Sequence, residues 1–175
     1  MTLKMRRFLV LLFIFLILIS IIFIPFKNCL VFQFQNSGQV LAYIPISTGE
    51  QFQVKYTHSI HLSDVIESYT VTKEGEIKQY QLEYEDFSIG MPSQAGEGER
   101  FEQKDGKYYL RNMNNYFPSF DLRLGKVRAH HTLIYKGKEY PLSDYIEPGT
   151  WIRIKVKKIN RWQEWKGVNI IEQTV

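Results

Sequence analysis

Residues 31–44, VFQFQNSGQVLAYI, predict a β-hairpin near the start of the chain. Two short segments rich in apolar side chains, 31–35 and 40–44, flank Asn36-Ser37-Gly38. Asn, Ser and Gly favour turns, and strand-like segments on both sides of a turn predict paired strands. The hairpin begins soon after a long apolar run, so we expect the chain to change from helix to sheet here.

Strand signals recur along the rest of the chain at short intervals. Alternation of apolar and polar side chains is clearest in residues 52–57 and 151–156, and it predicts strands with one buried face. Asp105-Gly106 is a favoured two-residue hairpin turn. The predicted strands are 52–57, 65–72, 77–85, 101–103, 108–110, 120–124, 130–135, 139–142 and 151–156, with a helical turn at 143–145. This series predicts an all-β fold, an antiparallel sandwich or a barrel-like domain.

Upstream of the hairpin, residues from Phe8 to Ile24 form an apolar run that only Ser20 interrupts. A hydrocarbon core about 30 Å thick needs roughly 17–25 apolar residues to cross it as a helix. The run and its short extension therefore predict one transmembrane signal anchor over residues 8–26. The remaining residues, 30–175, are expected to form the β domain.

The charges beside the apolar run predict its orientation. Lys4, Arg6 and Arg7 precede the run, and the first acidic residue of the chain is Glu50. Positively charged flanks stay in the cytoplasm, so residues 1–7 should be cytoplasmic and the β domain extracytoplasmic. The sequence thus predicts a single-pass protein of the cell membrane whose N-terminal helix binds the lipid bilayer.

A cleaved secretory signal is the alternative interpretation of the apolar run. A signal core has about 7–15 apolar residues and precedes a cleavage site with small residues at alternate positions. Here the run ends in FIPFKNC, residues 23–29, which has no small residue at that spacing. Lipid attachment at Cys29 would also need small residues before it, and Phe26-Lys27-Asn28 does not fit. The sequence favours an uncleaved anchor.

Composition limits the classes of partner. The chain has 22 Lys and Arg against 18 Asp and Glu, and removing Lys4, Arg6 and Arg7 leaves an almost balanced remainder. Most of the excess positive charge therefore lies in the flank of the predicted anchor, and we expect no nucleic acid partner. Cys29 is the single cysteine, so an internal disulfide and a cysteine-based zinc cluster are both excluded.

The densest polar segment, residues 56–61, contains His58 and Ser59. A hydrolase or a metal-dependent enzyme built around His58, Ser59, Glu67 and His131 is one hypothesis for it. Adjacent residues of a strand point to opposite faces, so His58 would need a bulge to activate Ser59. The histidines and Glu85 also lack the spacing of a zinc motif. We therefore predict no catalytic residue, no metal and no cofactor, and favour a non-enzymatic protein.

A glycine-rich loop over residues 88–99 is the best candidate for specific binding. Long loops on a rigid sheet often carry binding residues, and Gly90, Gly96 and Gly98 allow unusual backbone conformations. A flexible connection is the alternative. The candidate binding residues are His58, Ser59, Glu67, Gly90, Pro92 and His131.

Two tryptophans near the C-terminus, Trp162 and Trp165, lie among basic residues. Such a segment suits contact with a membrane interface. The alternative is a terminal segment that packs its tryptophans on the sheet.

A series of short motifs follows the anchor. Residues 54–59 read VxYxHS, residues 65–69 read VxExY, and residues 87–92 read FSxGxP. Asn112-Met113, the LRLG segment at 122–125 and His131 complete the series. From Phe52 to Leu142 the chain resembles the bacterial family called domain of unknown function 1850. Met91-Pro92 departs from the family loop, which often has an alanine and an extra glycine there.

The resemblance implies an accessory role in transport. The family is generally encoded near TRAP-type transporters of the TAXI class, which pair an extracytoplasmic solute receptor with a permease. A membrane-anchored β domain that docks to the permease or the receptor is therefore the leading hypothesis. A small-solute binding domain, with the loop at 90–98 closing over its ligand, is the alternative. The family has no established catalytic residues, so none are carried over.

Overall fold

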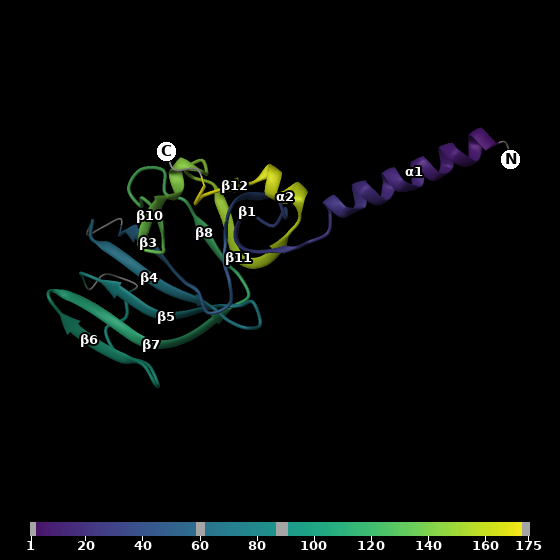
Figure 1. The fold of residues 1–175 in the computed structure, drawn as a ribbon. Helices are drawn as coiled ribbons and strands as arrows, with labels where there is room; N and C mark the ends of the chain where they lie inside the picture. Colours follow the sequence, from purple (N-terminus) through teal and green to yellow (C-terminus); the bar gives the residue numbers. More distant parts are fainter. Residues whose placement is uncertain (1–2, 59–61, 87–90, 173–175) are drawn as a thin grey trace.

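The computed structural model of the chain describes residues 3–58, 62–86 and 91–172. A long helix, α1 (Leu3–Ile22), leads into a β body, residues 27–172, whose strands form two sheets (Figure 1). The sheets pack on one another without closing into a barrel, and almost all neighbouring strands are antiparallel. The prediction of an antiparallel sandwich is therefore confirmed.

The smaller sheet has the order β12-β2-β1-β11-β8. Its members are β1 (Lys27–Phe34), β2 (Val40–Pro45), β8 (Phe120–Arg123), β11 (Trp151–Ile159) and β12 (Val168–Asn169). β1 and β2 pair as an antiparallel hairpin, which confirms the prediction for residues 31–44. Central β1 also pairs with β11 along its whole length, from Lys27 opposite Ile159 to Phe34 opposite Ile152.

The larger sheet has the order β10-β9-β3-β4-β5-β7-β6. Its members are β3 (Gln51–Thr57), β4 (Asp64–Val71), β5 (Ile77–Tyr84), β6 (Arg100–Lys104), β7 (Lys107–Phe117), β9 (Thr132–Tyr135) and β10 (Lys138–Pro141). Hairpins β4–β5, β6–β7 and β9–β10 confirm three further predictions. The short 3-10 helix η1 (Leu142–Asp144) follows β10, close to the predicted helical turn.

Two features of the fold differ from the sequence-based expectation. β7 is eleven residues long because a bulge carries it past Leu110, with Asn112 in the left-handed region at φ 59°. Asn tolerates this conformation better than most residues, and a bulge bends the strand locally. The C-terminal segment also forms a short helix, α2 (Arg161–Lys166), and then β12, which joins β2 in parallel.

The main hydrophobic core lies between the two sheets. Phe32 and Ile154 of the smaller sheet and Val54 and Leu133 of the larger sheet are among its buried members. A second cluster of buried apolar residues lies further along the same face of the larger sheet. Its buried members are Val65, Leu82, Tyr84, Leu110 and Met113.

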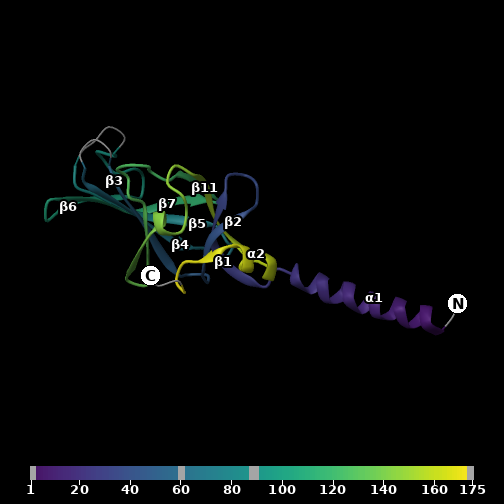
Figure 2. The same ribbon diagram turned by 90° about the horizontal axis from the view of Figure 1, so that it is seen from above.

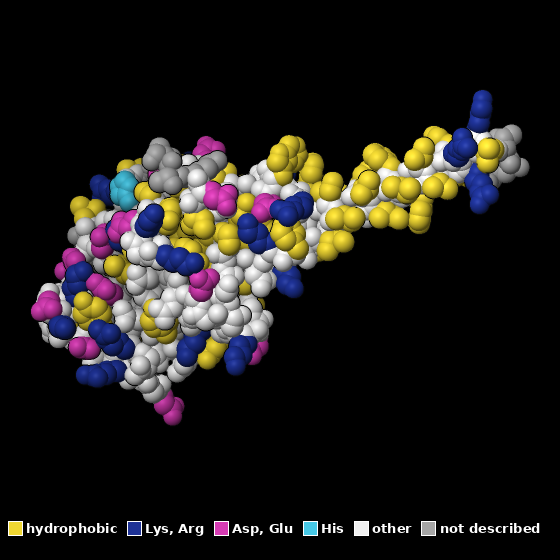
Figure 3. Space-filling model, viewed as in Figure 1, with side chains coloured by type: hydrophobic (Ala, Val, Ile, Leu, Met, Phe, Trp, Pro, Cys, Tyr) yellow, Lys and Arg dark blue, Asp and Glu magenta, His cyan; other side chains and the backbone are white. Residues whose placement is uncertain are grey.

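α1 projects away from the β body (Figure 2). Its side chains are exposed. At about 1.5 Å per residue its twenty residues extend about 30 Å, which matches the hydrocarbon thickness of a bilayer. Apolar side chains cover it along its length, and basic side chains gather at its free end (Figure 3). By length and composition this helix fits a single-pass membrane anchor.

Candidate functional site

The carboxylate of Glu67 lies in a row of apolar side chains on the inward face of the larger sheet. Val54, Glu67, Leu82 and Leu110 lie opposite one another on β3, β4, β5 and β7. Residues opposite one another in antiparallel strands share a face, so Glu67 points to the same side as its apolar neighbours. Glu67 thus lies between the main core and the second cluster.

Glu67 accepts a hydrogen bond from a neighbouring tyrosine. The Tyr69 hydroxyl donates to Glu67 Oε2 at 2.7 Å. Burial raises the pKa of Glu67, and the hydrogen bond from Tyr69 opposes part of that rise. Burial likewise raises the pKa of Tyr69, and the nearby Glu67 carboxylate raises it further. The pair therefore has a neutral phenol and a carboxyl group that keeps its proton more readily than an exposed one.

Tyr56 connects this pair to His131. The Tyr56 and His131 rings lie 5.7 Å apart between centroids. Burial raises the pKa of Tyr56, and the Glu67 charge adds to the rise. Burial lowers the pKa of His131, whose Nδ1 accepts a 3.2 Å hydrogen bond from the Gly125 amide. A neutral His131 with a protonated Nε2 satisfies this geometry.

We call Tyr56, Glu67, Tyr69 and His131 the inner cluster. It combines a carboxylate, two phenol hydroxyls and an imidazole in largely apolar surroundings. A few placed polar groups in an apolar setting suit the binding of a small polar or cationic group. Glu67 and His131 were predicted as binding residues from the sequence, whereas Tyr56 and Tyr69 were not. The signal for Tyr69 was its alternate spacing with Val65 and Glu67, which places the carboxylate on the apolar face.

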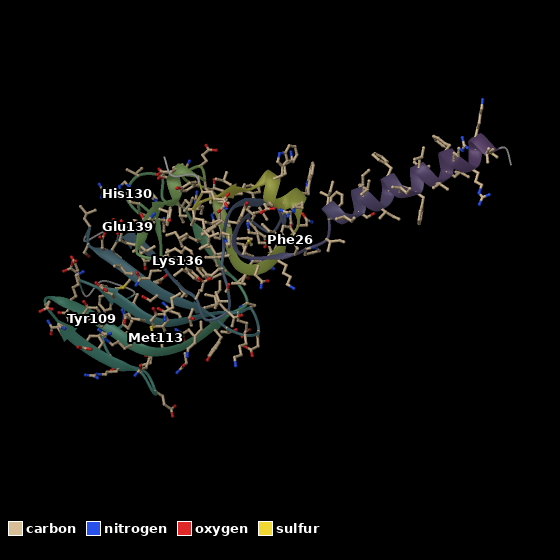
Figure 4. The ribbon with its side chains drawn as sticks, viewed as in Figure 1. Phe26, Tyr109, Met113, His130, Lys136 and Glu139 are labelled. Carbon is tan, nitrogen blue, oxygen red and sulfur yellow. The ribbon has the colours of Figure 1, made fainter. Side chains whose placement is uncertain are left out.

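Two other candidate residues, His58 and Pro92, lie beyond the ends of β3 and β5 in the larger sheet. His58 directly follows β3, and its amide donates to the Ser63 carbonyl at 2.8 Å. The Pro92 carbonyl accepts a hydrogen bond from Tyr84, which ties the loop to the second cluster. Ser59 and Gly90 lie outside the described residues. Of the adjacent histidines, His131 is half-buried and His130 is exposed at the surface of the body (Figure 4).

No group of three or more His, Cys, Asp and Glu side chains is arranged to hold a metal within residues 3–58, 62–86 and 91–172. The buried Cys29 lies far along the chain from the inner cluster, in a separate apolar cluster with Val31 and Ile159. Burial raises the pKa of the Cys29 thiol to about 12, so it remains protonated and unreactive at neutral pH.

The outward face of the larger sheet is polar and bears two hollows that were not predicted from the sequence. A hollow of about 360 Å³ includes Gln51, Gln53 and Tyr80, and one of about 430 Å³ includes Tyr80 and Arg111. Cross-strand bonds fix the amides of this face: Gln53 donates to Ser68 at 3.0 Å, and Arg111 donates to Gln81 at 3.1 Å. These residues occupy the polar positions of the alternating strands, so the pattern predicted their face but not the hollows.

The chain matches the model of the family described as domain of unknown function, DUF1850, over residues 52–142. This chain belongs to the DUF1850 family. The matched range covers just over half of the chain and contains every member of the inner cluster. No curated protein and no solved structure matches the chain. The DUF1850 region forms most of the larger sheet, whereas β1, β2, β11 and β12 lie outside the matched range.

Proposed function

We propose that this DUF1850 protein is a non-enzymatic accessory component of a TRAP-type solute transporter of the TAXI class. Family membership supports the proposal through the transporter association that the resemblance implies. The proposed partners are the permease and the solute receptor, and the proposed docking element is the β body. Neither a cofactor nor a catalytic residue enters the proposal.

The proposed arrangement divides the chain into three parts. Residues 1–7 form the cytoplasmic flank, residues 8–26 the transmembrane signal anchor, and residues 30–175 the extracytoplasmic β domain. Lys4, Arg6 and Arg7 support this orientation because basic flanks resist translocation. Protease added to intact spheroplasts should digest the β domain, and replacing all three basic residues with glutamate should scramble the orientation.

The short, fixed junction between α1 and the β body carries the proposal. Only residues 23–26 separate α1 from β1. The Phe26 amide donates to the Ile159 carbonyl at 3.0 Å, and Asn160 Nδ2 donates to the Phe23 carbonyl at 3.2 Å. A body tied so closely to its anchor stays at the bilayer surface, where a permease or a receptor bound to it would be within reach.

Co-purification from cross-linked membranes tests the docking proposal. The tagged full chain should recover permease or receptor subunits, and a control with α1 joined to an unrelated domain should not. A second control, with the native β body behind a foreign anchor, should still recover them. Recovery of only the tagged chain by all variants would contradict the proposal.

The inner cluster supports a second candidate function, binding of a small polar or cationic solute. The observation in its favour is the Glu67 carboxylate, which lies on the inward face beside the Tyr69 hydroxyl. A solute that binds there should raise the thermal unfolding temperature of the full chain through linkage. Glu67→Gln is the matched control, because it keeps the shape and removes the charge. A solute screen with no shift for either protein would contradict this candidate.

A further inference from the structure

Four exposed aromatic side chains surround the point where α1 meets the β body. Phe23 and Phe26 belong to the junction, and Trp162 and Trp165 belong to α2. Their exposed fractions run from 44% for Trp162 to 73% for Trp165. α2 lies beside the body end of α1 in two perpendicular views (Figures 1 and 2). Phe26 lies next to α2 (Figure 4). We call these four residues the aromatic collar.

The collar is a connected patch whose parts are held in place. The rings of Phe23 and Trp162 are 6.4 Å apart, and those of Trp162 and Trp165 are 5.3 Å apart. Asn160 caps α2, since its side chain accepts from the Gln163 amide at 2.8 Å. The same Asn160 side chain donates to the Phe23 carbonyl at 3.2 Å. One residue thus fixes both the start of α2 and its position against the junction.

Basic side chains accompany the collar. The Arg161 guanidinium lies 4.2 Å from the Phe26 ring centroid, and Lys166 Nζ lies about equally close to both tryptophan rings, at 5.1 and 5.0 Å. The local carboxylate, Glu164, is already paired with Lys27 at 2.9 Å and Arg161 at 2.7 Å. Lys27 and residues 157–166 together contain five basic residues and one acidic residue. The surface around the collar is therefore cationic.

We propose that the aromatic collar is a second membrane contact, which enters the headgroup region of the leaflet where α1 ends. In the proposed arrangement residues 8–26 cross the hydrocarbon core, and β1 begins at Lys27, so the collar lies where this span ends, at the adjoining interface. Tryptophan favours this interface because its ring is apolar and its indole N–H is polar. The surrounding basic side chains complement the phosphates of anionic lipids. The collar thereby fixes the orientation of the β body on the bilayer.

Tryptophan quenching in the purified full chain tests this contact without any protein partner. Three variants would each keep one of Trp151, Trp162 and Trp165, with phenylalanine at the other two positions, in vesicles containing anionic lipid. Trp151 is the built-in control, because its side chain is 49% exposed. Trp151 and Ile159 are the first and last residues of β11, so they lie up to about 26 Å apart along the strand.

Lipids brominated near the headgroup should quench Trp162 and Trp165 at least twofold more than Trp151. Aqueous acrylamide should give the reverse order. If acrylamide quenches all three tryptophans equally and the brominated lipids quench none, the proposal is overturned and the collar is free for a protein partner.

Charge reversal separates the lipid contact from simple packing. In vesicles with anionic lipid, the pair Arg161→Glu and Lys166→Glu should lower bromolipid quenching of Trp165 about twofold. Lys104→Glu, on β6 at the edge of the larger sheet, is the matched control and should leave quenching unchanged. Circular dichroism would verify that each variant is folded. Unchanged quenching in the folded double variant would overturn the role given to anionic lipid.

Discussion

Glu67 and Tyr69, two residues apart on β4, share the inward face of the larger sheet, and the Tyr69 hydroxyl donates a 2.7 Å hydrogen bond to the Glu67 carboxylate. A carboxyl group in apolar surroundings is unfavourable unless it is hydrogen-bonded or protonated. The hydrogen bond from Tyr69 therefore satisfies the half-buried carboxyl group of Glu67, which remains titratable between two apolar clusters.

Tyr69→Phe should destabilise the folded protein. It keeps the ring that stacks on Phe52 at 5.2 Å and removes the hydroxyl that satisfies Glu67. Hydrogen bonds to charged groups contribute about 1.5–3 kcal/mol, so a loss near the lower end of this range is expected at neutral pH. Urea unfolding of the full chain in detergent would measure it. Tyr80→Phe is the control, because the Tyr80 hydroxyl contacts Gln51 on the exposed face. Equal losses in the two variants would contradict the role of Glu67.

Glu67 should make the stability of the protein depend on pH in the acid range. Its folded-state pKa lies above its ordinary value, so the folded state binds the proton more tightly than the unfolded state. The stability that this proton provides is present below the unfolded-state pKa and is lost as pH rises through the folded-state pKa. Glu67→Gln should remove this loss of stability with rising pH. Unfolding free energies of both proteins across the acid range would show it. Parallel curves would mean that the Glu67 pKa is unchanged on folding.

Neighbouring aromatic residues of β1 should differ sharply in their contribution to stability. Phe32 is fully buried between the sheets, whereas Phe34 is 37% exposed at the strand end. Phe32→Ala should cost about 3–5 kcal/mol through lost burial and the cavity left behind. Phe34→Ala should cost less than half of that. Urea midpoints in detergent would compare the two, and similar losses would contradict the packing of the sheets.

Asn160 should have two separable roles. Asn160→Ala removes the cap of α2 and should destabilise that helix by about 1 kcal/mol. Asn160→Asp keeps the acceptor for the Gln163 amide and loses the donor to the Phe23 carbonyl. The Ala variant should therefore change the tryptophan emission of α2 more than the Asp variant. Identical emission spectra for both variants and the native chain would contradict the capping role.

The individual hairpins could be predicted because their signals are local. The alternation in residues 52–57 and the Asp105-Gly106 turn each specify a strand or a hairpin without reference to the rest of the chain. α2 was missed because six residues are too few to display helical periodicity. The two residues of β12 pair in parallel with β2, which depends on the tertiary fold. No residue pattern in β7 marked the bulge at Asn112 beforehand.

The inner cluster was predictable only in part, because its members come from separate strands and a loop. Glu67 and His131 were singled out by residue type. Tyr56 joins them only because β3 pairs with β4 in a register that sets it opposite Val65. The His131 contact with the Gly125 amide also depends on the loop between β8 and β9. The alternation of apolar and polar residues predicts which face of a strand each side chain occupies. The side chains that become neighbours across strands depend on the register, which the structure shows.

Cross-linking mass spectrometry on intact membranes tests the proposed transport partnership most directly. Exposed lysines of the β body, such as Lys104 and Lys138, offer amine-reactive positions on opposite edges of the larger sheet. Cross-linked peptides that join the β body to a TRAP-type permease or its solute receptor are predicted, and they should vanish when α1 carries an unrelated domain. Cross-links confined to the chain itself, in membranes where both transporter components are present, would contradict the proposed partnership.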